Sequence, residues 1–245
     1  DVPTGASATA VAFGNGATVT GANAVGLGKN VKATLSDAVV IGTDAKAETA
    51  GGGVAIGQNA YSKALYGNTP SVAVGKNSIA NGGTAVAIGT GATVNEAGTS
   101  FSQGIAIGGG ALPGQGATVV GDQGIAIGGN TVASGDSSIV VGGDDVEVAF
   151  SRTVTYTDIN TGQAKTGTLR QASIDLANIQ LPQYITATAS HAGTAIGMKT
   201  KAGDLGLSLG MGADSATRLD GKAGNVVNAI AIGAGAKANR DNSIA

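Results

Sequence analysis

The sequence predicts an all-β solenoid, a fold in which short strands stack as successive coils. Three observations predict it: an apolar segment recurs about every 14 residues, its residues alternate in size, and a residue suited to a tight corner follows each copy. Alternation with a period of two indicates strands. A short period sustained over many copies indicates coils that bury their apolar faces against their neighbours.

The recurring segment has the form Ala-Val-Ala-Ile-Gly with small variations. The copies are residues 10–14, 24–28, 38–42, 53–57, 71–75, 85–89, 104–108, 124–128, 138–142 and 229–233. Their final glycines are separated by 14, 14, 15, 18, 14, 19, 20, 14 and 91 residues, so the base period is 14 with insertions. In one copy we expect Val86 and Ile88 to fill the core. Ala85, Ala87 and Gly89 would then form a small-residue outer face, which a second copy of the chain would cover.

A backbone corner is expected two residues after each final glycine. Gly, Asn or Asp stands at every one of these positions, and these residue types tolerate a positive φ. The corner residues are Gly16, Asn30, Asp44, Asn59, Asn77, Gly91, Gly110, Asn130, Asp144 and Gly235. The small residues that follow, as in 45–47, fit a second, shorter strand. Each coil should therefore contain two strands and two corners, and successive coils should pair in parallel.

Composition limits the core and the possible partners. The chain has 43 Gly, 3% aromatic residues and neither Trp nor Cys, which predicts a thin core and excludes thiol chemistry. Lys and Arg total 14 without clustering, and the net charge is −2, so no nucleic-acid partner is expected. No apolar run approaches the roughly 18 residues of a membrane helix.

The repeat resembles the YadA-like head repeat of trimeric autotransporter adhesins, over residues 8–143 and 227–245. Residues 239–245 resemble the start of another copy, which predicts that the chain is a piece of a longer protein. The resemblance implies a left-handed parallel β-roll assembled as a homotrimer, with a stalk and an outer-membrane anchor outside this segment. It also implies a bacterial cell-surface location and attachment to an extracellular matrix protein such as collagen, to host cells or to abiotic surfaces.

The collagen-associated motif of that family reads Asn-Ser-Val-Ala-Ile-Gly, and the chain has no exact copy. The nearest segment is residues 70–75, with Pro in place of Asn and Val in place of Ile. The candidate ligand contacts in it are Ser71, Val72, Ala73, Val74 and Gly75. The alternative is that this segment is one more coil of scaffold.

The period fails between the copies at 138–142 and 229–233, which predicts three parts. These are β-roll repeats at 1–143, an inserted β-rich subdomain at 144–226, and resumed repeats at 227–245. Within the insertion we expect strands at 148–150, 153–157, 166–170, 184–189, 195–199 and 205–209, and one or two helical turns at 173–179. Its candidate ligand contacts are Tyr156, Arg170, Tyr184 and the single histidine, His191, since Tyr and Arg are common where binding energy concentrates. The alternative is that the insertion only stabilises the trimer.

Two arrangements resemble catalytic or metal sites, and neither is favoured. Ser190 precedes His191, but a catalytic triad needs its members brought together in space with an orienting acid. Asp144, Asp145 and Glu147 offer carboxylates to a cation, but a calcium solenoid repeats Gly-Gly-x-Gly-x-Asp, which is absent here. No catalytic residue, metal ligand or cofactor is therefore expected.

Three other functions are alternatives to the adhesin. An acyltransferase on a left-handed β-helix is suggested by residues 88–93, which resemble one hexapeptide unit, but such enzymes keep a six-residue period and place a His in the helical body. An ice-binding solenoid needs a file of Thr, whereas the positions three residues after the first six final glycines are Ala17, Val31, Ala45, Ala60, Ser78 and Ala92. A purely structural spacer in a surface fibre is the remaining alternative. The sequence favours the adhesin.

Overall fold

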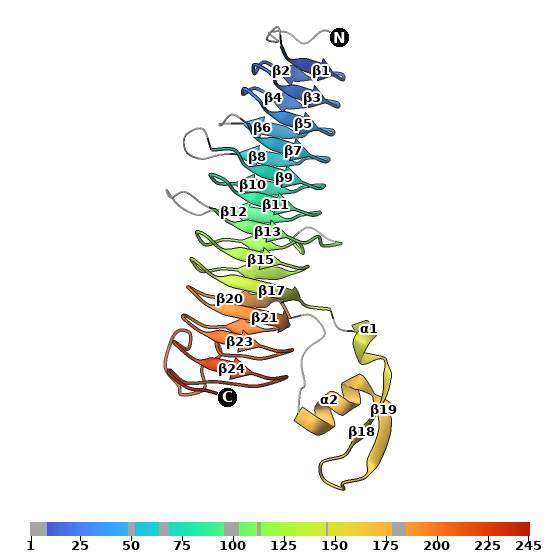
Figure 1. Ribbon diagram of the computed structural model, residues 1–245, viewed down its shortest axis with the longest axis vertical. Coiled ribbons are helices and arrows are strands. Elements are labelled where there is room, and N and C mark those ends of the chain that lie inside the picture. Colours follow the sequence, from blue (N-terminus) through green and yellow to red (C-terminus); the bar gives the residue numbers. More distant parts are fainter. Residues whose placement is uncertain are drawn as a thin grey trace. The chain divides into compact units, whose positions relative to one another are not determined.

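The computed structural model describes residues 9–48, 52–63, 69–95, 103–111, 114–145, 147–177 and 185–245. It divides into two units, residues 1–139 and 140–245. Unit 1 is a parallel β-solenoid, as predicted: each coil contributes one strand to each of two sheets (Figure 1). None of the helices in the described ranges is long and apolar enough to span a bilayer.

The two sheets of unit 1 contain strands of two or three residues. The first sheet has the order β1 (Val11–Phe13), β3 (Val25–Leu27), β5 (Val39–Ile41), β7 (Val54–Ile56), β9 (Val72–Val74), β11 (Val86–Ile88), β13 (Ile105–Ile107) and β15 (Ile125–Ile127). The second has the order β2 (Thr18–Val19), β4 (Lys32–Ala33), β6 (Lys46–Glu48), β8 (Tyr61–Lys63), β10 (Ile79–Asn81), β12 (Thr93–Asn95), β14 (Thr118–Val119) and β16 (Thr131–Ala133). Neighbouring strands pair in parallel with equivalent residues in register, such as Val11 with Val25.

Small side chains from both sheets fill the interior of each coil. From β3 onward the middle residues of the first-sheet strands are buried, and Ala73 and Ala87 among them are 0% exposed. Ala80 and Val94 of the second sheet face them, also at 0%. The space between the sheets is narrow, because a Cβ added to Gly26 would lie 2.4 Å from Cγ2 of Val19. A coil with only two short strands therefore has no room for large side chains.

The predicted orientation of the first-sheet strands is wrong. We expected Val86 and Ile88 inside and Ala85, Ala87 and Gly89 outside, but Ala85 and Ala87 are fully buried and Ile88 is 39% exposed. The alternation was recognised correctly, but its two faces were exchanged. The cause is the thin core, which accepts Ala and Gly and excludes the larger residues.

The predicted corners are largely confirmed. Eight of the ten predicted residues have φ between 52° and 70°, the exceptions being Gly110 and Asp144. Additional loop residues follow Gly110, and the non-solenoid segment follows Asp144, so the chain leaves the regular coil at both places. A second corner recurs before the first-sheet strands, where Asn23, Asp37 and Thr84 have φ of 56°, 60° and 59°.

Unit 2 contains more solenoid and one additional subdomain. Its first sheet has the order β17 (Ile139–Gly143), β21 (Thr194–Met198), β23 (Leu207–Leu209) and β24 (Ile230–Ile232), and its second has β20 (Ala187–Ala189) and β22 (Lys201–Ala202). The subdomain contains α1 (Glu147–Phe150), β18 (Thr153–Thr157), β19 (Ala164–Thr168) and α2 (Leu169–Ala177), with β18 and β19 forming an antiparallel hairpin.

The structure differs from the predicted insertion at 144–226. Predicted strands near 184–189, 195–199 and 205–209 do form, as β20, β21 and β23, but they belong to the solenoid sheets. Residues 148–150, expected as a strand, belong to α1, and residues 169–170, expected as the end of a strand, begin α2. The insertion is therefore confined to residues between Gly143 and Ala187.

Candidate interaction surfaces

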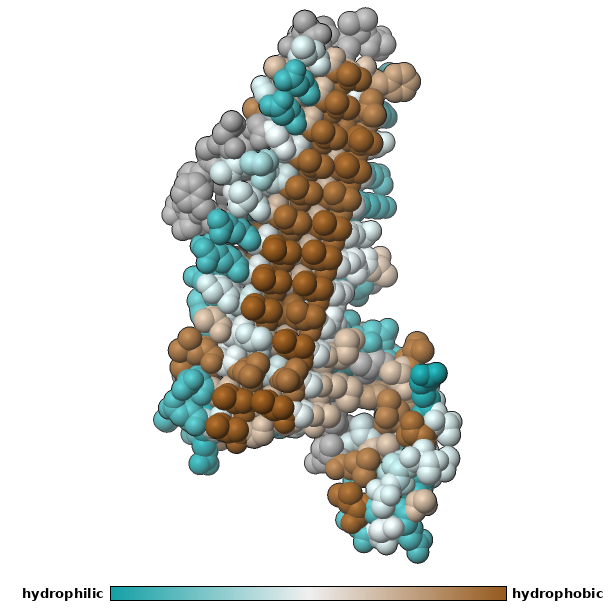
Figure 2. All heavy atoms as spheres, in the orientation of Figure 1, coloured by the Kyte–Doolittle hydropathy of each residue, from teal (hydrophilic) through white to brown (hydrophobic). Residues whose placement is uncertain are grey.

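Two files of apolar side chains cover the outer side of the first sheet in unit 1. They arise because the first and third residues of each strand point outward while the middle residue points inward. The first file is Val11, Val25, Val39, Val54, Val72, Val86, Ile105 and Ile125. The second is Phe13, Leu27, Ile41, Ile56, Val74, Ile88, Ile107 and Ile127. We call these two files the apolar band; Figure 2 shows it as a continuous brown strip.

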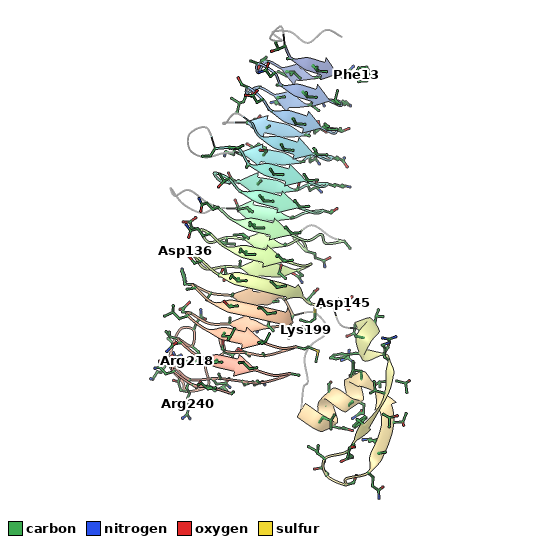
Figure 3. The ribbon with its side chains drawn as sticks, in the orientation of Figure 1. Phe13, Asp136, Asp145, Lys199, Arg218 and Arg240 are labelled. Carbon is green, nitrogen blue, oxygen red and sulfur yellow. The ribbon has the colours of Figure 1, made fainter. Side chains whose placement is uncertain are left out.

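Side chains of the apolar band are exposed to solvent although they are apolar. Ile107 and Ile127 are each 38% exposed, and Phe13, which projects from the end of β1 (Figure 3), is 77% exposed. Single apolar residues at a surface are ordinary, whereas a contiguous apolar strip marks an interface. In unit 2 the third residues of the first-sheet strands have the same character, with Leu209 at 41% and Ile232 at 54%.

The outer side of the second sheet is polar in unit 1. It presents Lys32, Lys46 and Tyr61 in successive register, and Tyr61 Oη donates a hydrogen bond of 3.1 Å to Glu48 Oε2. Partial burial, followed by the carboxylate of Glu48, raises the pKa of Tyr61. The two sheets therefore differ: the second is suited to water and the first to another apolar surface.

The candidate segment 71–75 coincides with β9 and the residues beside it. Ser71 and Ala73 are buried inside the coil, and Ser71 Oγ lies 2.8 Å from Ser62 Oγ. Val72 and Val74 lie in the apolar band, and Gly75 stacks on Gly89 of the next coil. Of the five candidates, only the two valines present side chains at the outer surface of the sheet.

Tyr156 and Arg170 make contacts within the subdomain of unit 2. Tyr156 Oη donates to Asp175 Oδ2 at 2.5 Å, and Lys165 Nζ donates to the same oxygen at 2.5 Å. Hydrogen bonds from Lys165, Tyr156 and Gln171 lower the pKa of Asp175 to about 2, and the bond to Asp175 raises the pKa of Tyr156. Arg170 pairs with Glu147 of α1.

The guanidinium of Arg170 also lies 4.9 Å from the ring centre of Phe150. This distance is within the range of a cation–π interaction. Arg170 thus joins α2 to α1 through both an ion pair and an aromatic contact. Tyr156 and Arg170 therefore make contacts that stabilise the fold of the subdomain.

His191 lies at a solenoid corner between β20 and β21, outside the subdomain. Its side chain is 70% exposed, with Nδ1 3.6 Å from Asp204 Oδ1. Ser190 Oγ accepts a hydrogen bond of 2.8 Å from Asn225 Nδ2. Tyr184 lies outside the described residues. The described candidates of unit 2 are therefore divided between the subdomain, with Tyr156 and Arg170, and the solenoid, with His191.

The acidic residues near 144–147 have structural partners. Asp145 Oδ1 accepts the backbone N–H of Glu147 at 2.9 Å, and Glu147 itself pairs with Arg170. In the part of the chain that the structure describes, three or more His, Asp or Glu side chains nowhere gather as a metal site would require.

The family comparison matches the solenoid. The YadA head domain repeat matches residues 36–61, 68–92, 114–144 and 227–245. Over these four segments the chain is similar to YadA heads. The matched segments contain five strands of the apolar band (β5, β7, β9, β11 and β15) and β24 of unit 2. The resemblance to trimeric autotransporter adhesin heads is thereby confirmed. None of the curated proteins matches the chain significantly.

The sequence analysis missed two coils of the solenoid, which also lie outside the segments matched by the family model. The final glycines stack as Gly142, Gly197, Gly210 and Gly233, each Cβ position lying against the next glycine's backbone. Residues 193–197 read Gly-Thr-Ala-Ile-Gly, which fits the repeat pattern closely enough to be recognised. Residues 206–210 read Gly-Leu-Ser-Leu-Gly, where the buried middle residue is Ser208.

Proposed function

We propose that the chain is the head of a homotrimeric bacterial surface adhesin that attaches to an extracellular matrix protein such as collagen, to host cells or to abiotic surfaces. The observation that supports it is the apolar band. A chain alone in water would leave two files of Val, Ile, Leu and Phe in contact with solvent, at an unfavourable free energy of about 25 cal/mol for each Å².

A closed trimer relieves this cost, because each protomer can cover its neighbour's band around a shared axis. The polar second sheet then faces outward, where it meets the surface to which the cell attaches. The match to the YadA head repeat supports the same assembly, and with it a location at the cell surface through an outer-membrane anchor.

The experiment compares the chain with a variant in which Ile107→Asp and Ile127→Asp place charges on adjacent rungs of the band. The control, Thr93→Asp with Thr118→Asp, makes the same change of charge on adjacent rungs of the second sheet. Light scattering should give three times the chain mass for the wild type and the control, and one chain mass for the band variant.

Adhesion of the trimer to collagen, cultured cells and bare plastic is measured in the same preparations. Binding to at least one of them, lost in the band variant, supports the adhesin. A trimer that binds none would favour the structural spacer instead, and a wild type that stays monomeric at high concentration would contradict the assembly.

A further inference from the structure

A polar cleft of about 620 Å³ lies on the second-sheet side of unit 2. Its floor includes Thr188 of β20 and Lys201 of β22, and its wall is formed by residues 216–225. The cleft's volume is in the range of ligand sites in proteins. Because it lies on the second sheet, it remains accessible when the outer side of the first sheet is covered.

The wall exists because one coil is lengthened. The final glycines Gly210 and Gly233 are 23 residues apart, nine more than the base period of 14. Asp214 begins the loop by accepting the backbone N–H groups of Ala216 at 2.9 Å and Thr217 at 2.8 Å. Such Asx-type hydrogen bonds fix the direction in which a loop leaves a strand.

Arg218 holds the loop in place. Its side chain is only 7% exposed; it donates to Asp220 Oδ2 at 2.8 Å and to the carbonyl of Asn225 at 3.0 Å, and it pairs with Asp241. Asp241 in turn accepts the backbone N–H of Val227 at 2.9 Å, and this bond, then Arg218, lowers its pKa. These contacts preorganise the wall, which reduces the ordering cost of binding.

The lining is cationic and rich in hydroxyl groups. Lys201, Lys222 and Arg218 line it together with the hydroxyls of Thr188 and Ser190, and no carboxylate is among its described lining residues. Lys222 is 70% exposed, and the carboxylate nearest to it, Asp220, is 3.9 Å away. Arg218 Nε is buried and has no hydrogen-bond partner. Because Asp220 and Asp241 already pair with Arg218, the positive charge open to a ligand is that of Lys201 and Lys222, which favours an anionic ligand.

We propose that this cleft binds an acidic saccharide chain, one that carries sulfate or carboxylate groups on a hydroxyl-rich backbone. The lysines pair with the anionic groups, and the threonine and serine side chains exchange hydrogen bonds with sugar hydroxyls. The inference rests on the proposed adhesin function and names a ligand class for it. An acidic peptide would use the cations but leave most of the hydroxyl lining without partners.

The test uses the full chain and a heparin-derived octasaccharide at about 0.15 M salt, where surface attraction is screened beyond roughly 8 Å. The cleft variant carries Lys201→Gln and Lys222→Gln. The control carries Lys32→Gln and Lys46→Gln, which remove the same charge from adjacent rungs of the second sheet in unit 1. Calorimetry should show binding to the wild type, at least about tenfold weaker binding to the cleft variant, and a change under twofold in the control.

Neutral dextran fragments and an octamer of glutamate serve as comparison ligands. Equal losses in the cleft variant and the control, equal binding of dextran, or no octasaccharide binding at all would each overturn the inference. Tighter binding of the glutamate octamer would overturn it in favour of an acidic peptide. Adhesion is measured in parallel, so adhesion without octasaccharide binding contradicts only this inference, and octasaccharide binding without adhesion contradicts only the proposed function.

Discussion

At the scale of single residues, two separate constraints require a glycine at the end of most first-sheet strands. These glycines have φ between 116° and 151°, a conformation that side chains rarely adopt. They also stack directly, so that a Cβ on Gly57 would lie 2.6 Å from the backbone of Gly75. Gly91, a corner glycine two residues later, meets only the constraint of a positive φ, since the nearest atom to its Cβ position is the backbone N of Gly116 at 3.9 Å.

One coil contains both kinds of glycine, so the effects of substituting them can be compared. Gly89→Ala should lower the free energy of unfolding by about 2–4 kcal/mol, because it combines a disallowed φ with a contact of 2.7 Å to the carbonyl carbon of Gly108. Gly91→Asn should change it by less than about 0.5 kcal/mol, since Asn59 and Asn77 already occupy this corner in other coils. Urea denaturation of both variants measures the difference, and equal destabilisation would contradict the stacking argument.

Residue type predicted one corner of each coil but not the other. Only Gly, Asn or Asp stands at the first corner of the copies found in the sequence, and this restriction allowed the corner to be predicted. The second includes Thr84, Gln123, Ala192 and Leu205, with φ between 50° and 59°, and such a mixed set gives no signal. Its conformation is imposed by the strands on either side, and side-chain ladders such as Asn23 to Asp37, at 3.2 Å, stabilise it.

At the scale of elements, alternation predicts a strand but does not say which face is buried. The answer depends on the thickness of the core, which is a property of the whole coil. Two strands joined by tight corners leave space only for side chains as small as those of Ala87 and Val94. The prediction that Val86 and Ile88 fill the core is wrong for that reason. The apolar face left for a partner is therefore the one with Val and Ile.

The subdomain of unit 2 should lose stability at acid pH through Asp175. Its pKa of about 2 lies below that of an unfolded carboxyl, near 3.9, so its contribution is present above about pH 4 and is lost as the pH falls towards 2. Asp175→Asn should therefore weaken the hairpin at pH 7 and make little difference at pH 2. NMR signals of residues 153–168 followed in urea test this, with Asp37→Asn as a remote control. A variant effect that is the same at both pH values would be inconsistent with it.

The subdomain should also be dispensable for the solenoid. Gly142 and Gly197 are 55 residues apart, so removing the 42 residues 145–186 leaves 13, the same spacing as between Gly197 and Gly210. Joining Asp144 to Ala187 therefore gives a coil of a length that the chain already uses. Circular dichroism should show retained strand structure and a melting temperature within about 5 °C of the wild type.

The deletion also separates two roles of the insertion. A deleted chain that keeps the trimer mass in light scattering supports an independent subdomain. One that folds but dissociates into single chains would show that residues 145–186 stabilise the assembly. Loss of the solenoid itself would contradict the coil-length argument.

At the scale of the whole molecule, the repeat determines the fold and produces the surface through which we propose that the chain assembles. Successive coils repeat the same small inner and large outer residues. The few outward apolar side chains of each coil therefore join into one continuous apolar surface. Sequence reasoning found the repeat and the family, because both depend on many copies. It did not find the cleft of unit 2, because that site depends on a single lengthened coil whose loop gives no periodic signal.

Assembly through the apolar band predicts that thermal stability depends on protein concentration. If folded trimers melt to unfolded chains, each tenfold rise in concentration stabilises the folded state by about two thirds of 1.4 kcal/mol per chain, or about 0.9 kcal/mol. For a chain of 245 residues this raises the melting temperature by roughly 2–3 °C. Calorimetry over a hundredfold range of concentration should therefore show a rise of roughly 4–6 °C in the wild type. The Ile107→Asp, Ile127→Asp variant should show no such rise. A wild type whose melting temperature is independent of concentration would mean that the band is not the interface that stabilises this head.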